Sequence, residues 1–104
     1  MRRYALSQEA EEDLGDIRAY YLARASARTT RYVMREITKA MGFLASTPGA
    51  GHSREDLTDD PVKFWPVFSY LIIYDPATQP IGVARVLHGG QDLKTLLKRH
   101  TPRP

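Results

Sequence analysis

The sequence predicts an α+β fold in which an antiparallel helical hairpin packs on one face of a small antiparallel sheet. Two observations predict this fold class. The first half of the chain contains two segments with apolar residues at helical spacing. The second half contains three short strand-like segments joined by turn residues, which is typical of an antiparallel meander. The expected element order is β-α-α-β-β-β, beginning with an N-terminal strand and followed by a short C-terminal helix.

Composition limits the class of protein. The chain has 104 residues, of which 42% are hydrophobic, and no linker or repeat, so we expect one domain over residues 1–104. The absence of cysteine excludes disulfides and thiolate metal sites and fits a reducing cytoplasm. No apolar run approaches the length needed to cross a membrane, so we expect a soluble cytoplasmic protein without a membrane partner.

The first helix is expected to follow a short strand over residues 2–6. Ser7 stands where a helix N-cap belongs, and acidic residues follow in the first turns, where the helix dipole favours them. The apolar stripe consists of Ala10, Leu14, Ile17 and Tyr21, widened by Tyr20. We expect Asp13 and Asp16 to lie off this stripe, in solvent.

The second helix is expected to begin after Ser26, a second N-cap, and to end at Pro48-Gly49. Its apolar positions are Tyr32, Val33, Ile37, Met41 and Leu44. The short connection between the two helices predicts an antiparallel pair. The polar, turn-rich residues 50–62 then predict a loop.

Three strands follow this loop. Residues 63–68 contain Pro66, which predicts an edge or bulged strand. Residues 69–75 (SYLIIYD) are apolar at nearly every position, as in a central strand covered on both faces. Residues 81–87 form the third strand, which Gly89-Gly90 ends. Beyond it, Asp92 can cap a short helix that carries Leu93, Leu96 and Leu97.

Arg85 is a lone charge inside the last strand. Alternation places it on one face with Ile81, Val83 and Leu87, and places Ala84 and Val86 on the other face. An arginine on an open sheet face could bind phosphate or carboxylate through its planar fork. The alternatives are solvent exposure or a salt bridge, for which the expected partners are Asp75, Glu55 and Asp56.

Few residues in the sequence suggest a metal site or a catalytic activity. Three histidines far apart in sequence form no recognisable ligand pattern, so we expect no metal site and no cofactor. A metal-free nuclease needs a base, an acid and cations, and the residues that could supply them are Arg85, His88, Lys63, His100 and Tyr70. Their spacing does not require this arrangement. The acid-free C-terminal segment suggests an anionic partner or a solvated helix end.

The whole chain resembles the ParE branch of the RelE/ParE superfamily, the toxins of bacterial type II toxin–antitoxin pairs. The matching segments are Tyr4-Ala5-Leu6-Ser7 with Ala10, Asp13-Leu14 with Ile17, Tyr20-Tyr21, Leu44-Ala45, Pro48-Gly49-Ala50-Gly51, Arg54-Glu55-Asp56-Leu57, Tyr70-Leu71-Ile72-Ile73-Tyr74 and Arg85-Val86-Leu87-His88-Gly89-Gly90-Gln91-Asp92-Leu93. Each piece alone is weak, but the ordered set is specific. The fold that the resemblance implies agrees with the layout predicted from periodicity.

The resemblance implies a growth inhibitor neutralised by direct binding of a cognate ParD-like antitoxin, in a hetero-oligomer. ParE members poison DNA gyrase, without assigned catalytic residues, whereas RelE members cut messenger RNA on the ribosome. RelE cleavage uses a lysine- and arginine-rich sheet face with a late tyrosine or histidine. That set is incomplete here, because no tyrosine follows Tyr74 and the C-terminal basic group is only Lys98, Arg99 and His100. The favoured hypothesis is therefore a non-enzymatic inhibitor of gyrase. The alternative is a RelE-type ribosome-dependent endoribonuclease using Arg85, Lys63 and His100, and a third possibility is an inactive homologue that only binds antitoxin.

The resemblance also implies an interaction surface, since antitoxins of this family wrap an acidic, amphipathic segment around the toxin. The residues expected to bind antitoxin or target are Arg85, His88, Trp65, Phe68, Lys94, Lys98 and Arg99. Trp65 could equally belong to the core. We expect no sequence-specific DNA binding by this chain alone.

Overall fold

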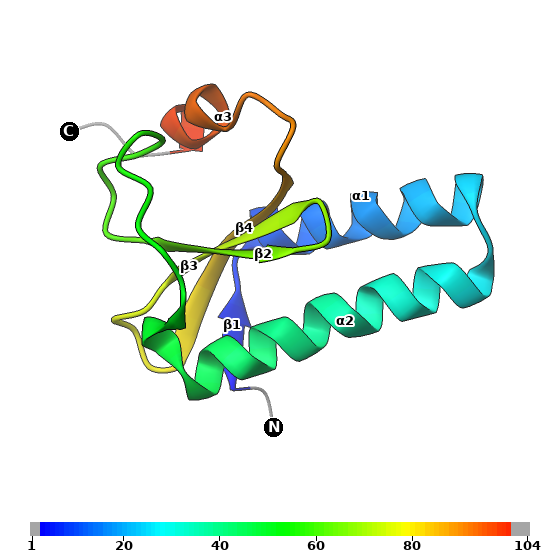
Figure 1. Ribbon diagram of the computed structural model, residues 1–104, viewed down its shortest axis with the longest axis horizontal. Coiled ribbons are helices and arrows are strands. Elements are labelled where there is room, and N and C mark those ends of the chain that lie inside the picture. The colour runs from blue at the N-terminus through cyan, green and yellow to red at the C-terminus, as the bar shows by residue number, and fades with distance from the viewer. Residues whose placement is uncertain (1–2, 101–104) are drawn as a thin grey trace.

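The computed structural model describes residues 3–100 of the chain, with side chains up to residue 97. Its elements follow the expected order (Figure 1). They are β1 (Tyr4–Leu6), α1 (Gln8–Arg24), α2 (Ala27–Ser46), a 3-10 turn η1 (Pro48–Ala50), β2 (Lys63–Val67), β3 (Tyr70–Asp75), β4 (Ile81–His88) and α3 (Leu93–His100). The α+β class and the element order are therefore confirmed.

The sheet is mixed rather than wholly antiparallel. Its strand order is β1-β4-β3-β2. The meander of β2, β3 and β4 is antiparallel, as expected, with β2 at the edge and β3 in the interior. However, β1 pairs in parallel with β4, in a register that places Leu6 opposite Val83. A parallel neighbour needs a long crossover connection, and the helical hairpin is part of that crossover. The expectation of an antiparallel sheet was wrong for this strand.

The caps predicted from sequence start both long helices. The Ser7 hydroxyl accepts a hydrogen bond from the Ala10 backbone N–H at 2.9 Å. The same hydroxyl donates to the Ala84 carbonyl at 2.6 Å, so one side chain both caps α1 and joins it to β4. The Ser26 hydroxyl accepts from the Thr29 N–H at 3.1 Å in the same way.

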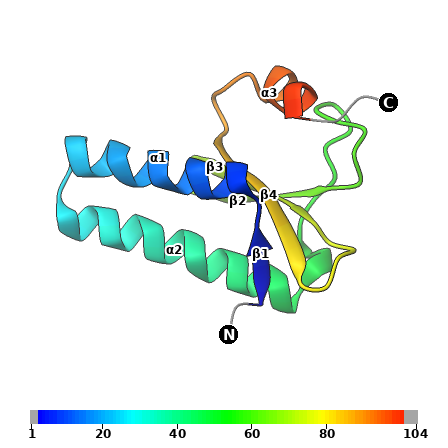
Figure 2. The ribbon, with the colours of Figure 1, turned by 180° about the vertical axis from the view of Figure 1, so that it is seen from behind.

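The main core lies between the hairpin and the sheet. Its buried residues are Ala10, Ile17, Val33, Ile37, Met41, Leu44, Tyr70, Ile72, Tyr74, Ile81, Val83 and Val86. Two aromatic residues expected on the buried stripes are not in it, since Tyr20 is 49% exposed and Tyr32 is 47% exposed. Tyr20 lines a groove that it shares with Tyr70, and Tyr32 packs against Phe68. Figures 1 and 2 show that the end of the hairpin where α1 meets α2 projects past the sheet.

A second apolar cluster covers the opposite face of the sheet. It combines Phe64, Ile73 and Leu87 from the strands with Leu93 and Leu97 from α3. Figure 2 shows α3 on the other side of the strands from α2. As predicted, Asp92 caps α3: its carboxylate accepts from the Thr95 N–H at 3.3 Å and hydroxyl at 2.8 Å. These two hydrogen bonds lower the pKa of Asp92.

A bulge in β4 changes which side chains share a face. Arg85 lies opposite Ile73, yet Val83 lies opposite the next residue, Tyr74, so Ala84 is an extra residue in β4. As a result Val83 and Val86 both enter the main core, although strict alternation places them on opposite faces. The expected grouping of Ile81 and Val83 with Arg85 was therefore wrong.

Candidate functional site

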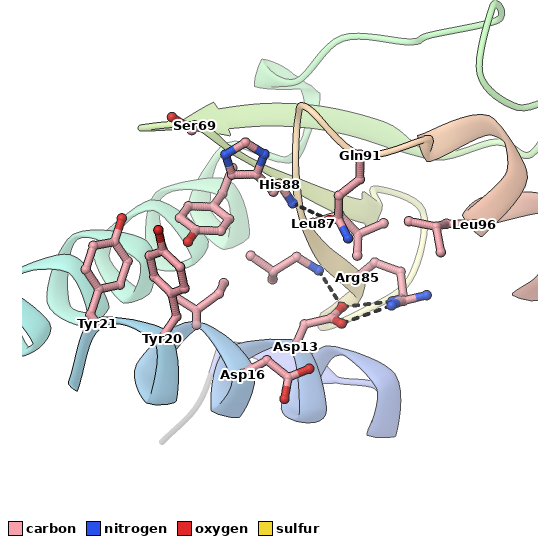
Figure 3. Close-up of a pocket in the computed structure, with 13 residues that line it drawn as sticks. Asp13, Asp16, Tyr20, Tyr21, Ser69, Arg85, Leu87, His88, Gln91 and Leu96 are labelled. Atoms are coloured by element: carbon pink, nitrogen blue, oxygen red, sulfur yellow. Dashed lines mark hydrogen bonds and ion pairs between the residues drawn. The ribbon is translucent and has the colours of Figure 1, made fainter. Parts of the chain in front are cut away.

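Arg85 is held in an ion pair by Asp13 of α1 (Figure 3). Its Nε donates to one Asp13 oxygen at 2.8 Å, and its Nη2 donates to the other at 2.9 Å. The side chains are only 12% and 10% exposed, respectively. Bidentate pairing of this kind is the strongest geometry available to an arginine and a carboxylate. The bond to Asp13 raises the pKa of Arg85 further above its ordinary value.

The same carboxylate also closes an open sheet edge. Because β1 ends at Leu6, opposite Val83, the edge of β4 beyond that point has no partner strand. Asp13 accepts the Val86 backbone N–H at 3.0 Å, which satisfies a buried donor on this edge. The Asp13 side chain thus takes the place of a neighbouring strand at Val86.

The partner of Arg85 was wrongly predicted. None of Asp75, Glu55 and Asp56 binds it, and Asp13, expected in solvent, is buried at 8% exposure. A sequence signal did exist. Asp13 lies three residues after Ala10 and four before Ile17, so it falls on the buried stripe of α1. An acid on an apolar stripe needs a buried partner, and Arg85 is the lone charge in the adjacent strand.

The pairing leaves little of Arg85 for a ligand. Two of its three guanidinium nitrogens bind Asp13. The third, Nη1, is buried and has no hydrogen-bond partner within the described part of the chain. A phosphate that bound Nε and Nη2 would have to displace the buried Asp13 carboxylate. The geometry therefore indicates a structural role for Arg85.

A groove of about 700 Å³ borders the ion pair. We call it the tyrosine groove, because Tyr20 and Tyr21 of α1 and Tyr70 of β3 all line it. Burial, with a smaller contribution from a hydrogen bond to Tyr21, raises the pKa of Tyr70 to about 12. This phenol is therefore protonated at neutral pH and cannot serve as a general base there.

His88 lies at the rim of the tyrosine groove. It is exposed, as expected at the end of β4, and its ring meets the Tyr70 ring edge-on at 5.5 Å. Its Nδ1 accepts the Gly90 backbone N–H at 3.0 Å, which occupies one of the two ring nitrogens. The groove thus offers aromatic surface and hydroxyls, with its arginine already paired.

The structure does not bring the alternative nuclease residues together. Lys63 pairs in register with Tyr74, which faces the main core, whereas Arg85 pairs with Ile73 of the opposite cluster. By strand alternation, Lys63 and Arg85 therefore leave opposite faces of the sheet. His100 lies in α3, but its side chain is outside the described residues. The same holds for Lys98 and Arg99, whereas Lys94 on α3 is exposed.

A second surface runs between α2 and the edge strand β2. We call it the aromatic flank, defined by Tyr32 and Phe43 of α2 with Trp65 and Phe68 beside them. Phe68 is 53% exposed and lies 5.9 Å from the Tyr32 ring between centroids. Trp65 is half-buried and lies 5.3 Å from the Phe43 ring, so it belongs partly to the core and partly to the surface. Phe68 was expected here, but Tyr32 and Phe43 were not.

The aromatic flank has a hollow but no free strand donor. The hollow has a volume of about 390 Å³ and is lined by Ala40 and Phe43 of α2 and by Trp65, Pro66 and Val67 of β2. On the outer edge of β2, the Phe64 N–H and carbonyl already pair with His52. The next residue that points outward is Pro66, which has no N–H. This edge therefore suits side-chain docking better than an added strand.

A metal centre and a membrane-spanning helix are two further features that the described residues could form. No group of three or more histidine or acidic side chains there is arranged to hold a metal ion. No helix in that part of the chain is long and apolar enough to span a membrane.

The comparisons with known proteins agree with one another. Residues 4–93 match the sequence profile described as "ParE toxin of type II toxin-antitoxin system, parDE". Among solved structures, a chain from "Chromosomal ParDE TA system from P. aeruginosa" aligns with a TM-score of 0.70 and 16% sequence identity. The alignment covers 82% of this chain and 92% of that one, and at this identity it shows a shared fold. No significant match was found among curated proteins.

Proposed function

The chain belongs to the ParE toxin family of type II toxin–antitoxin systems, and from this premise we propose that it inhibits growth when free and is neutralised by direct binding of a ParD-like antitoxin. The observation that carries the proposal is the family match over residues 4–93. We propose DNA gyrase as the target, and hence the cytoplasm as the place of action.

The geometry of the site supports inhibition by binding rather than by catalysis. RNA cleavage needs exposed cations next to an acid and a base. Here Arg85 is bound by Asp13, and Lys63 leaves the other face of the sheet. Tyr70, the tyrosine nearest to His88, keeps its proton to about pH 12.

We assign antitoxin docking to the aromatic flank. Exposed aromatic side chains are the usual anchors of protein interfaces, and this flank pairs Tyr32 with Phe68 and Phe43 with the half-buried Trp65. Tyr32 and Phe43 are eleven residues apart on α2, so about 16 Å of helix separates the two pairs. A partner helix with apolar residues at i, i+4, i+7 and i+11 matches that length. Acidic residues on its margin would complement Lys39, which lines the hollow of the flank.

The docking assignment is tested by measuring antitoxin affinity. Phe43→Ala with Phe68→Ala should raise the Kd for the antitoxin by about 30-fold or more, since truncated anchors lose at least about 1 kcal/mol each. Tyr20→Ala with Leu22→Ala is the matched control, because these α1 residues are equally exposed. Equal losses in both variants would place the interface elsewhere.

The target is tested by gyrase supercoiling with purified chain, free of antitoxin. Inhibition accompanied by trapped cleaved DNA, and reversed by added antitoxin, is the expected result. Unimpaired supercoiling at chain concentrations well above that of gyrase would contradict the gyrase assignment. The next assay would then be messenger RNA cleavage on ribosomes. Growth unaffected by expression of the folded chain without antitoxin would contradict a toxic function altogether.

A further inference from the structure

The solvent side of α2 carries a row of arginines that neither the ion pair nor the aromatic flank uses. Arg28, Arg31 and Arg35 follow at spacings of three and four, so they lie along one side of the helix. All three are exposed, and we call them the arginine stripe. Within the described residues, Arg28 and Arg31 have no ion-pair partner, and Arg35 lies 5.9 Å from the Tyr32 ring.

Charge is separated along the hairpin. Residues 17–53 contain six cationic residues and one acid, Glu36, which lies 3.7 Å from Lys39. All the acids of α1 lie between Glu9 and Asp16, at the end of the helix that meets the sheet. Like charges gathered on a projecting element create a positive potential that attracts an anionic partner. The projecting end of the hairpin is therefore the basic end (Figure 1).

The stripe differs from the aromatic flank in its chemistry. On a helical wheel the arginines are centred opposite the buried stripe of Val33 and Ile37, whereas Tyr32 and Phe43 turn toward β2. A protein interface needs a desolvated apolar centre, which the stripe lacks. Charge alone would have to provide the binding energy, and a nucleic-acid backbone is the partner for which charge alone suffices.

We propose that the arginine stripe binds the phosphate backbone of duplex DNA without reading its sequence. The guanidinium fork matches phosphate oxygens, and Arg28 and Arg35 are about 10 Å apart along α2, so the three side chains can reach successive phosphates. This activity needs neither antitoxin nor gyrase, so it stands or falls separately from the proposed function. It would hold the free chain on DNA through its hairpin.

The test is fluorescence anisotropy of a labelled duplex of about 20 base pairs, titrated with the purified full chain. Three phosphate contacts give a slope of about −2.7 for log K against log salt, or about 40-fold weaker binding when salt rises fourfold. Arg28→Gln with Arg31→Gln should flatten that slope by about 1.8. Arg3→Gln with Lys94→Gln removes the same net charge from exposed positions outside the hairpin, and should leave the slope unchanged.

Three results would overturn the proposal. The first is no binding to the duplex at about 50 mM salt, where phosphate contacts are strong. The second is an equal loss in both double variants, because net charge alone would then explain the binding. The third is binding of a polyglutamate peptide as tightly as the duplex, if the Arg28→Gln/Arg31→Gln variant loses it. That result would assign the stripe to an acidic protein. Glutamine matches arginine in helix propensity, and circular dichroism of each variant verifies that the fold is retained.

Discussion

Arg85 and the arginines of α2 carry the same side chain in opposite circumstances. Arg85 is buried in the sheet, and two of its nitrogens bind the Asp13 carboxylate. Arg28 and Arg31 are exposed and have no carboxylate partner in the described structure. An arginine inside a strand attracts attention in the sequence because it interrupts an apolar run. Such an interruption can therefore mark a buried structural ion pair, while the arginines without an ion-pair partner lie on the exposed surface of a helix, where the sequence pattern gives no sign of them.

The largest expected effect comes from removing the partner of the buried arginine. Asp13→Ala leaves the Arg85 charge and the Val86 N–H buried without an acceptor, which should destabilise the fold by about 3–5 kcal/mol. Urea unfolding followed by circular dichroism measures this loss. Asp16→Ala, one turn away and exposed, should change stability by less than about 0.5 kcal/mol. Similar values for the two variants would contradict the structural role of the pair.

Disrupting a second buried polar contact should destabilise the fold somewhat less. The Tyr74 hydroxyl donates to the Pro48 carbonyl at 2.6 Å and accepts the Gly51 N–H at 2.9 Å, joining the 3-10 turn η1 to the sheet. A Cβ on Gly51 would lie 2.6 Å from that hydroxyl oxygen, so Gly51→Ala should destabilise by about 2–3 kcal/mol. Gly49→Ala, with no atom within 4 Å of the added carbon, is the control in the same thermal melts.

Alkaline titration tests whether the tyrosine groove is dry. The folded pKa of Tyr70, about 12, is above its ordinary value of 10.0, so folding favours the protonated phenol. The resulting stability is fully present below pH 10 and is lost as the pH rises toward 12, up to about 2 kcal/mol in all. Tyr70→Phe should remove this part of the pH dependence, which urea unfolding between pH 9 and pH 12 can resolve. A Tyr70 that ionises near pH 10 in absorbance titration would show instead that water reaches it.

The smallest effect on stability is expected from the exposed arginines of α2. Arg28→Gln with Arg31→Gln should change the free energy of unfolding by less than about 0.5 kcal/mol, because neither side chain has an ion-pair partner within the described chain. Chemical denaturation of this variant and of Asp13→Ala, under the same conditions, measures the smallest and the largest of these changes in the free energy of unfolding. A loss above about 1 kcal/mol would mean that these arginines also stabilise the fold.

Much of the fold could be predicted from local patterns. Ser7 and Ser26 indicate the helix starts, and the apolar segment 69–75 indicates an interior strand. The pairing of β1 with β4 could not be read in this way, because parallel contacts depend on packing far along the chain. The bulge at Ala84 was also missed. One extra residue in a strand cannot be recognised in a run of apolar residues, yet every side chain after it points to the opposite face of the sheet.

The candidate site was less predictable than the fold. Exposure of His88 and Phe68 agrees with the expectation, since each stands at the end of a strand. The status of Arg85 depended on a partner 72 residues away in sequence, which local spacing cannot identify. Tyr32 shows the converse error. It was grouped with Val33 and Met41, but nine residues separate it from Met41, half a turn out of phase, and it packs against Phe68 instead.

The buried pair also changes which variant can test function. Arg85→Ala would leave Asp13 buried without its partner, so a loss of activity could reflect unfolding rather than a missing functional group. Asp13→Asn with Arg85→Gln removes both charges together. The amide oxygen that this change introduces on α1 could still accept the Val86 N–H, which preserves the closed edge of β4.

Gyrase supercoiling with this neutral double variant beside the wild-type chain tests whether Arg85 only stabilises the fold while activity depends on outer surfaces. Urea unfolding first confirms that the variant is folded. We predict that wild type and variant inhibit supercoiling at the same concentrations. A folded variant that no longer inhibits, beside an active wild type, would make Arg85 part of the toxic surface and contradict this account.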